Sequence, residues 1–152
     1  IPGPALRIYP LKQTANSGDE IDVYLYFEEV HADSAVSGMQ IEIQIDPVDL
    51  QYLPSSFGYD GLFSQYSAES FPFSPTYSES DGLGTIKIIA GVVGGGLSGT
   101  GSILKFKLNV LANDGTLNIN IKENSSLENS NGRSIGFRQA VSGVVTIGGA
   151  GL

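Results

Sequence analysis

The sequence predicts an all-β fold, an antiparallel two-sheet sandwich of about nine strands with a jelly-roll-like topology. Three observations support this prediction. Apolar and polar residues alternate with a period of two over several segments, as expected for strands with one buried face. Turn-forming sequences separate these segments, and no window has the apolar stripe and caps of an amphipathic helix. Glycine is abundant, with 20 residues, which suits a protein with many turns.

The clearest strand covers residues 20–27, in which Ile21, Val23, Leu25 and Phe27 point to one side. The same alternation recurs in residues 39–46, 103–111 and 116–122. The inward residues expected on these three strands are Met39, Ile41, Ile43, Ile45, Leu104, Phe106, Leu108, Val110, Leu117, Ile119 and Ile121. Five shorter strands are expected at residues 6–9, 50–53, 76–79, 85–91 and 142–147.

Turns are expected where Asn, Asp, Gly and Pro cluster between the strands. These clusters are residues 16–19, 46–47, 80–82, 113–115 and 131–132. Residues 54–75 are the least regular stretch and are rich in Ser, Tyr, Phe and Pro. We expect this stretch to be a long ordered loop, packed by Phe57, Phe63, Phe71 and Phe73.

Composition limits the class of function. A chain of 152 residues suits one domain with a sizeable core, so we expect a single domain over residues 1–152. Its net charge of −8 disfavours nucleic acid and anionic membrane surfaces as partners. Cysteine is absent, which excludes disulfides, thiolate metal sites and cysteine nucleophiles. The chain shows no signal peptide and begins Ile-Pro-Gly, so we expect it to be part of a larger protein.

Three glycines, Gly94, Gly96 and Gly99, match the G-x-G-x-x-G spacing of a dinucleotide-binding turn. Such a turn requires a helix after the third glycine, because the helix N-terminus binds the pyrophosphate. Here Thr-Gly-Ser and then an alternating strand follow Gly99. The nucleotide interpretation therefore fails, and residues 94–101 are expected to connect the two sheets.

Catalytic and metal-binding patterns are weak. The one histidine, His31, lies near Glu28, Glu29 and Asp33 in a segment that we interpret as a solvated loop rather than a metal site. No nucleophile motif accompanies this histidine. Most acidic residues lie in turns or at outward strand positions, the usual pattern of solvated carboxylates. We expect neither enzymatic activity nor a cofactor.

Several segments, taken in order, resemble a cohesin domain, the module that binds dockerins in cellulosomes and related extracellular assemblies. Residues 35–50 (AVSGMQIEIQIDPVDL) are similar to the family's third strand and its Asp-Pro-x-x-Leu turn. The strand that Gly84-Thr85-Ile86 opens, the glycine-rich connection and residues 103–110 resemble the sixth and seventh strands. Residues 127–132 and 141–148 resemble the last loop and the closing strand, which ends Gly-x-Val-x-Ile-Gly, and residues 6–27 fit the opening pair.

Two departures from the family pattern indicate a divergent member. Gly38 and Gln40 stand where well-studied cohesins carry an Asn and an Asp that contact dockerin. Gly91, Val92 and Val93 replace acidic residues expected after the sixth strand. The resemblance still implies a non-catalytic, extracellular or cell-surface module that is a monomer when unbound. It also implies that calcium belongs to the dockerin, whose loops resemble EF-hands, and not to this chain.

The resemblance also implies that strands eight, three, six and five form the dockerin-binding face. Ile89 is the large apolar residue among the outward positions expected there, which makes it a candidate binding hot spot. Arg133, in the loop before the last strand, is a further candidate from the family's loop contacts. The remaining outward positions are Gln40, Glu42, Gln44, Thr76, Ser78, Lys87, Gly91, Asn118, Asn120 and Lys122.

Two alternative functions remain open. A carbohydrate-binding module would use Tyr24 and Tyr26, outward on the second strand, near Lys105 and Lys107 if the second and seventh strands pair. Tryptophan, the residue best suited to stacking on sugars, is absent, and Tyr–Lys packing is an ordinary way to finish a solvated face. The other alternative is a spacer domain of a surface protein, without a ligand.

Overall fold

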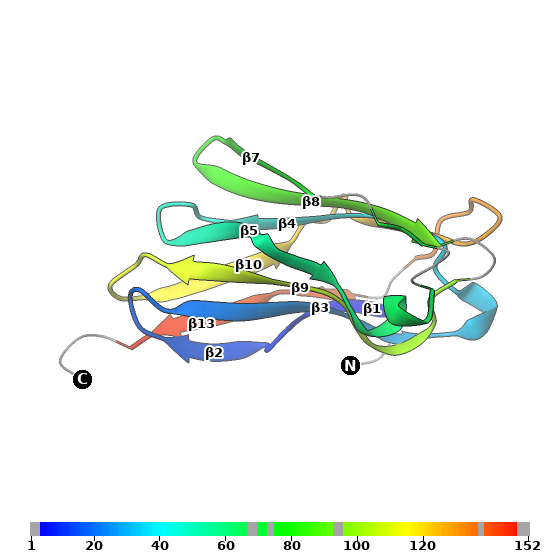
Figure 1. The fold of residues 1–152 in the computed structure, drawn as a ribbon, viewed down its shortest axis with the longest axis horizontal. Coiled ribbons are helices and arrows are strands. Elements are labelled where there is room, and N and C mark those ends of the chain that lie inside the picture. The colour runs from blue at the N-terminus through cyan, green and yellow to red at the C-terminus, as the bar shows by residue number, and fades with distance from the viewer. Residues whose placement is uncertain (1–3, 67–69, 73–74, 93–95, 137–138, 149–152) are drawn as a thin grey trace.

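The computed structural model describes residues 4–66, 70–72, 75–92, 96–136 and 139–148. These residues form thirteen strands in two sheets and two short 3-10 helices, η1 (Ala32–Ser34) and η2 (Gly61–Tyr66) (Figure 1). The smaller sheet has the order β12 (Gln139–Val141), β1 (Ala5–Tyr9), β3 (Glu20–Val30), β9 (Gly99–Val110), β5 (Leu50–Tyr59). The larger sheet has the order β2 (Lys12–Ala15), β13 (Gly143–Ile147), β10 (Thr116–Ile121), β4 (Gly38–Ile45), β8 (Leu83–Val92), β6 (Ser70–Pro72). Two further strands join the larger sheet, β11 (Ser126–Glu128) beside β4 and β7 (Thr76–Ser80) beside β8.

The expected fold class is confirmed, and each of the nine expected strands has its counterpart in the structure. Four short strands, β2, β6, β11 and β12, were not expected, because three or four residues are too few to establish an alternating pattern. Most pairs are antiparallel, but β1 with β12 and β13 with β2 pair in parallel. The two parallel pairs arise because the chain's first and last strand segments run side by side along one border of the sandwich.

Each of these two border segments contributes one strand to the smaller sheet and one to the larger sheet. β1 belongs to the smaller sheet and β2 to the larger one, and the break falls at Pro10, which has no N–H to donate to a ladder. In the same way, β12 pairs with β1, and β13 pairs with β2 after Ser142. The backbone N–H of Val144 donates to the Leu11 oxygen at 2.8 Å, so the parallel pairing continues into the break. The divided strands therefore link the two sheets at this border.

The core lies between the sheets and is built from the residues expected to face inward. All of the inward residues expected on the four long strands are buried. Phe27 from β3 and Phe106 from β9 are the largest fully buried side chains, and Ile41, Ile43 and Ile88 of the larger sheet are completely buried. The alternation of apolar and polar residues in the sequence thus matches the alternation of buried and exposed side chains in the strands.

Residues 54–66 are more regular than expected. β5 continues through this stretch to Tyr59, and η2 follows it. Phe63 is buried and Phe57 packs against the core, with the Tyr59 ring 5.1 Å from Phe57 and 5.0 Å from Phe63. The packing expected of these two phenylalanines is confirmed. Phe73 lies outside the described residues, as does the side chain of Phe71.

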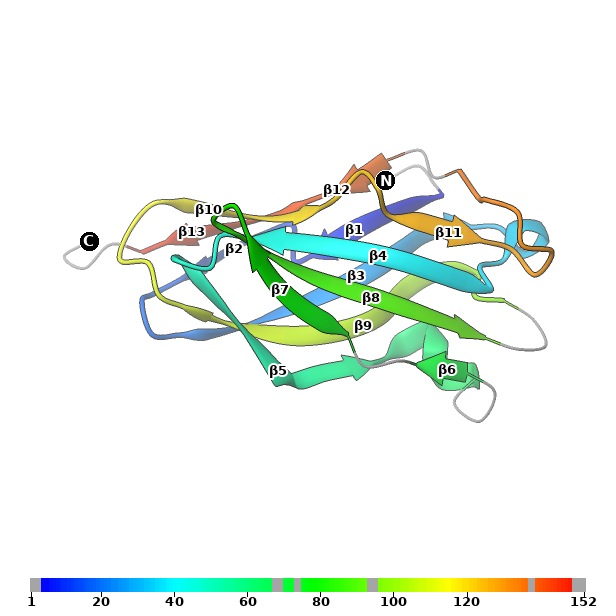
Figure 2. The same cartoon turned by 90° about the horizontal axis from the view of Figure 1, so that it is seen from above.

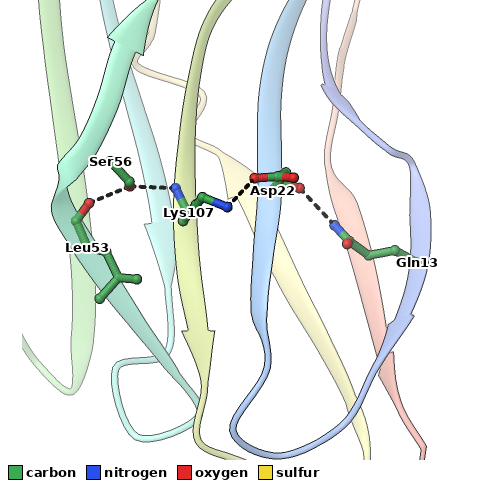
Figure 3. Close-up of polar contacts among 5 residues, drawn as sticks. All are labelled: Gln13, Asp22, Leu53, Ser56 and Lys107. Carbon is green, nitrogen blue, oxygen red and sulfur yellow. Dashed lines mark hydrogen bonds and ion pairs between the residues drawn. The ribbon is translucent and has the colours of Figure 1, made fainter.

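A bulge interrupts the pairing of β5 with β9 between Leu53 and Gly58, and the Ser56 hydroxyl connects the two strands there. The Ser56 hydroxyl accepts a hydrogen bond from the Lys107 backbone N–H at 2.7 Å and donates one to the Leu53 oxygen at 2.5 Å. As Figure 3 shows, the polar contacts continue across the neighbouring strands. The Lys107 ammonium lies 3.0 Å from the Asp22 carboxylate, which raises the pKa of Lys107, and the Gln13 side chain donates to the Asp22 backbone oxygen at 3.3 Å.

The glycine-rich segment connects the sheets, as expected, but residues 99–101, which were assigned to this connection, already belong to β9. The chain leaves β8 in the larger sheet and enters β9 in the smaller one. Residues 93–95, which include Val93 and Gly94, lie outside the described residues. Leu97 bridges to Val36, and β9 begins at Gly99 without any helix, so the requirement of a dinucleotide-binding turn is not met.

We expect Ser56→Ala to lower the free energy of unfolding by about 1–3 kcal/mol, because it leaves the Lys107 N–H without its acceptor. Urea denaturation followed by circular dichroism measures this difference. The matched control is Ser55→Ala at the exposed neighbouring position, for which we expect a change within about 0.5 kcal/mol. Equal stability of the two variants would show that the hydroxyl does not support the bulge.

Candidate functional site

The outward side chains of β10, β4, β8 and β7 form one continuous surface, which we call the β4–β8 face. Figure 2 shows the four strands side by side, in the order that the resemblance implied. The register places Gln40 opposite Ile89, Glu42 opposite Lys87 and Gln44 opposite Thr85. On the flanking strands, Asn120 is opposite Gln44, Thr76 is opposite Lys87, Ser78 is opposite Thr85, and Asn118 lies further along β10.

Ile89 lies on β8 two residues before Gly91, towards one end of this face, and is 46% exposed. Its inward neighbours Ile88 and Ala90 are buried, which confirms the expected alternation on β8. Ile89 also borders a hollow of about 210 Å³, whose lining includes Gly38, Gln40 and Ser126. An apolar side chain is therefore presented beside a depression in a polar surface.

A second exposed apolar residue, Leu83, also points outward from β8 and is 39% exposed. Sequence reasoning missed it, because the strand was expected to begin at Thr85. Leu83 lies at the β7–β8 turn, at the opposite end of β8 from Gly91. It borders a different hollow, of about 250 Å³, lined partly by Asp46 and Asp49.

The Glu42 side chain is held by groups of its own chain and is only 12% exposed. One carboxylate oxygen lies 3.6 Å from the Lys122 ammonium, and the other accepts a hydrogen bond from the Asn124 amide at 2.6 Å. The Glu42 N–H donates to the Ser125 hydroxyl at 3.1 Å. Glu42 thus fastens β4 to the turn between β10 and β11.

Unlike Lys122, Lys87 has no ion-pair partner in the part of the chain that the structure describes. It lies directly between Glu42 and Thr76 across the strands, and it is half-buried. Within the described residues, no carboxylate lies within 4.0 Å of its ammonium group. Its charge is therefore available to a partner.

One end of the face is nearly free of side chains because Gly91 and Gly38 lie opposite each other. A Cβ atom at Gly91 would lie 2.9 Å from the Ser37 backbone oxygen, which also accepts a hydrogen bond from the Val92 N–H. This close approach requires glycine, so position 91 contributes only backbone to the face. The sequence gives no signal for this constraint, since Ser37 belongs to a distant segment.

β11 extends the face beside β4 and was not expected. Ser126 and Glu128 are exposed and lie opposite Gln40 and Gly38. The loop after β11 holds Arg133, which is exposed. The Asn129 side-chain oxygen orders this loop by accepting hydrogen bonds from the N–H groups of Asn131 and Arg133, at 2.9 and 3.1 Å.

The outward face of the smaller sheet holds the tyrosines of the carbohydrate alternative. β3 and β9 pair as that alternative assumed, with Tyr24 opposite Lys105 and Asp22 opposite Lys107. The Tyr26 ring stacks on Tyr9 at 5.1 Å, and the Arg7 guanidinium lies 4.7 Å from the centre of the Tyr26 ring. These rings therefore pack on one another and on Arg7, which is paired with the buried Glu28.

Within the described part of the chain, no group of three or more His, Asp or Glu side chains is arranged to hold a metal ion. Glu28 is buried against Arg7, whereas His31 is exposed just before η1. None of the described helices has the length and apolar character needed to cross a membrane.

The fold and the β4–β8 face define a β-sandwich module with a largely polar, side-chain-rich surface on one sheet. Residues 10–147 match the model of the cohesin domain family. The chain belongs to the cohesin domain family. No curated protein matches its sequence significantly.

Solved cohesin structures share the fold at low sequence identity. The cohesin in the Coh-OlpC–Doc435 complex from Clostridium thermocellum has a TM-score of 0.72 at 14% identity, with 96% of this chain and 94% of that chain covered. A type II cohesin from the cellulosome of Acetivibrio cellulolyticus has a TM-score of 0.71 at 18% identity, covering 93% and 94%. A non-cellulosomal cohesin from the archaeon Archaeoglobus fulgidus has a TM-score of 0.68 at 15% identity, covering 95% and 90%.

We expect Arg7→Met to lower the free energy of unfolding by about 3–5 kcal/mol, because it leaves the Glu28 carboxylate buried without its cation. Adding Glu28→Met should restore most of this stability, since two apolar side chains of similar volume can replace a buried ion pair. Urea denaturation of both variants measures the difference. A double variant as unstable as Arg7→Met would contradict this account.

Proposed function

We propose that this cohesin binds a dockerin domain through the β4–β8 face and thereby anchors dockerin-bearing proteins in an extracellular assembly. Family membership supports the class of partner, and several similar cohesins were solved as cohesin–dockerin complexes. The observation that carries the choice of surface is Ile89, an apolar side chain exposed beside a hollow on a polar sheet face. Binding hot spots have this arrangement, with an apolar anchor surrounded by polar groups that exclude water.

The proposed contact residues fall into two groups. Ile89, Lys87, Gln40, Gln44, Asn118, Asn120, Thr76 and Ser78 project from the four strands, and Gly91 and Arg133 lie at one end of the face. Glu42 shapes the surface through its contacts with Lys122 and Asn124. The amides, hydroxyls and charges around Ile89 would supply the hydrogen-bonding surround.

We also propose that residues 1–152 act as one non-catalytic domain, located outside the cell or at its surface. The similar structures include cohesins of cellulosome scaffoldins, which supports this location. Neither the carbohydrate-binding nor the spacer alternative gains support from the relatives, and the Tyr9–Tyr26 stack covers ring faces that a sugar would need.

We expect Ile89→Asp to weaken dockerin binding by at least about 2 kcal/mol, because it would place a charge where the proposed interface excludes water. The thermal midpoint should change little, since the side chain points outward from the sheet. The measurement is calorimetric titration with the tightest binder selected from a displayed library of dockerin domains. Leu111→Asp is the matched control, because Leu111 is 43% exposed and lies outside the β4–β8 face.

Equal loss of affinity in Ile89→Asp and Leu111→Asp would assign the effect to added charge rather than to the face. Undiminished affinity in Ile89→Asp would place the binding surface elsewhere. Failure of the library to yield any binder would refute dockerin binding itself.

We expect removal of calcium with EDTA to abolish dockerin binding, because the metal orders the dockerin loops. The thermal midpoint of this chain alone should stay unchanged on the same treatment. Differential scanning calorimetry with and without EDTA makes the comparison. A lower midpoint for the isolated chain would place a calcium site on the cohesin.

A further inference from the structure

We infer that the β4–β8 face selects a partner helix that carries a carboxylate and an apolar side chain one helical turn apart. The carboxylate would pair with Lys87, and the apolar side chain would pack on Ile89. This inference rests on the proposed function and adds the chemistry by which the face distinguishes one dockerin from another.

The backbone of β8 is paired on both sides over most of its length. β4 pairs with it along Gly84–Gly91, and on its other side β7 pairs with residues 83–87 and β6 with residues 90–92. A partner therefore finds few free N–H and C=O groups there and cannot extend the sheet by adding a strand. Recognition at Lys87 and Ile89 must use side chains, and a helix laid on the flat face presents side chains in a fixed pattern.

The unpaired charge on the face favours a carboxylate on the partner. Lys87 and Glu42 are the charged side chains at the outward positions of the described residues of β10, β4, β8 and β7. Lys122 directly follows β10 and the exposed Glu128 lies on β11, so these four side chains sum to zero. The whole chain, in contrast, has a net charge of −8. Glu42 is committed to Lys122 and Asn124, which leaves Lys87 as the half-buried cation without an ion pair among the described residues.

A partner carboxylate that contacts a partly desolvated lysine contributes to binding affinity, because water is excluded from the charge pair when the interface forms. A basic partner residue at the same place would meet an unpaired like charge, which costs affinity and excludes that partner. Lys87 therefore acts as a specificity determinant as well as a contact.

The spacing of Lys87 and Ile89 fits one turn of a helix. They point to the same face of β8 and are two residues apart, which corresponds to about 6.6 Å along the strand. Residues i and i+4 of a helix are separated by about 6 Å along its axis and share one side. The hollow beside Ile89, with Gly38 and Gly91 at its end of the face, leaves room for the apolar side chain.

The test selects binders from a library of calcium-loaded dockerin domains in which exposed helix positions i and i+4 are randomised. We expect the wild-type chain to enrich Asp or Glu at one position and apolar residues at the other. Lys87→Glu should enrich Lys or Arg at the position where the wild type enriches acids. For a binder selected by the wild type, Lys87→Glu should lower the affinity on the order of 100-fold, and a Lys in place of the binder's acid should restore it.

Lys12→Glu is the matched control. It makes the same change in net charge on an exposed residue of the same sheet, but β13, β10 and β4 separate β2 from β8. We expect it to change the affinity by less than about threefold, as for a peripheral charge.

The failures of the two proposals are distinguishable. Binders that depend on Ile89 but carry the same residues whether position 87 is Lys or Glu would overturn the inference and leave dockerin binding standing. A library without any binder would overturn dockerin binding and the inference together.

Discussion

The burial of two facing rows of apolar side chains, one from each sheet, is the constraint on which the rest of this domain depends. Phe27 and Phe106 of the smaller sheet and Ile41, Ile43 and Ile88 of the larger one are removed from water. A slip of one residue in any long strand would expose its whole inward set, so burial fixes the register. The outward set is fixed by the same register. Glu42 must lie opposite Lys87, and Gln40 opposite Ile89, because their inward neighbours pair in the core.

This division explains how the fold persists at 14–18% sequence identity to the cohesins compared above. Inward positions need only be apolar and of suitable volume, a requirement that many residue combinations satisfy. Most outward positions are half-exposed or exposed, and substitutions there change stability little unless the residue is held by other groups of the chain, as Arg7, Glu42 and Gly91 are. A partner-binding surface on the outward side can therefore change its chemistry while the sandwich stays intact.

The long strands and their buried sides were predictable from sequence because their alternation extends over six residues or more. The same pattern predicted the outward exposure of Ile89. The sequence could not predict β2, β6, β11 and β12, whose three or four residues take their strand conformation from neighbouring strands. It also could not predict the commitment of Glu42 to Asn124 or the need for glycine at position 91. Both depend on segments far away in the chain, which only the fold brings together.

Glu42 shows why outward parity alone does not define a binding residue. It points to the same face as Gln40 and Gln44, yet its carboxylate is held by an ion pair and by a charge-assisted hydrogen bond from Asn124. Such a hydrogen bond contributes more to stability than an exposed ion pair does, about 1.5–3 kcal/mol against about 0–1 kcal/mol. The main role of Glu42 is therefore structural: it holds β4 against the turn that leads into β11. By holding that turn, it positions Ser126 beside Gln40 and sets the shape of the hollow next to Ile89. The proposed binding surface thus depends on an outward residue whose own charge is already neutralised within the chain.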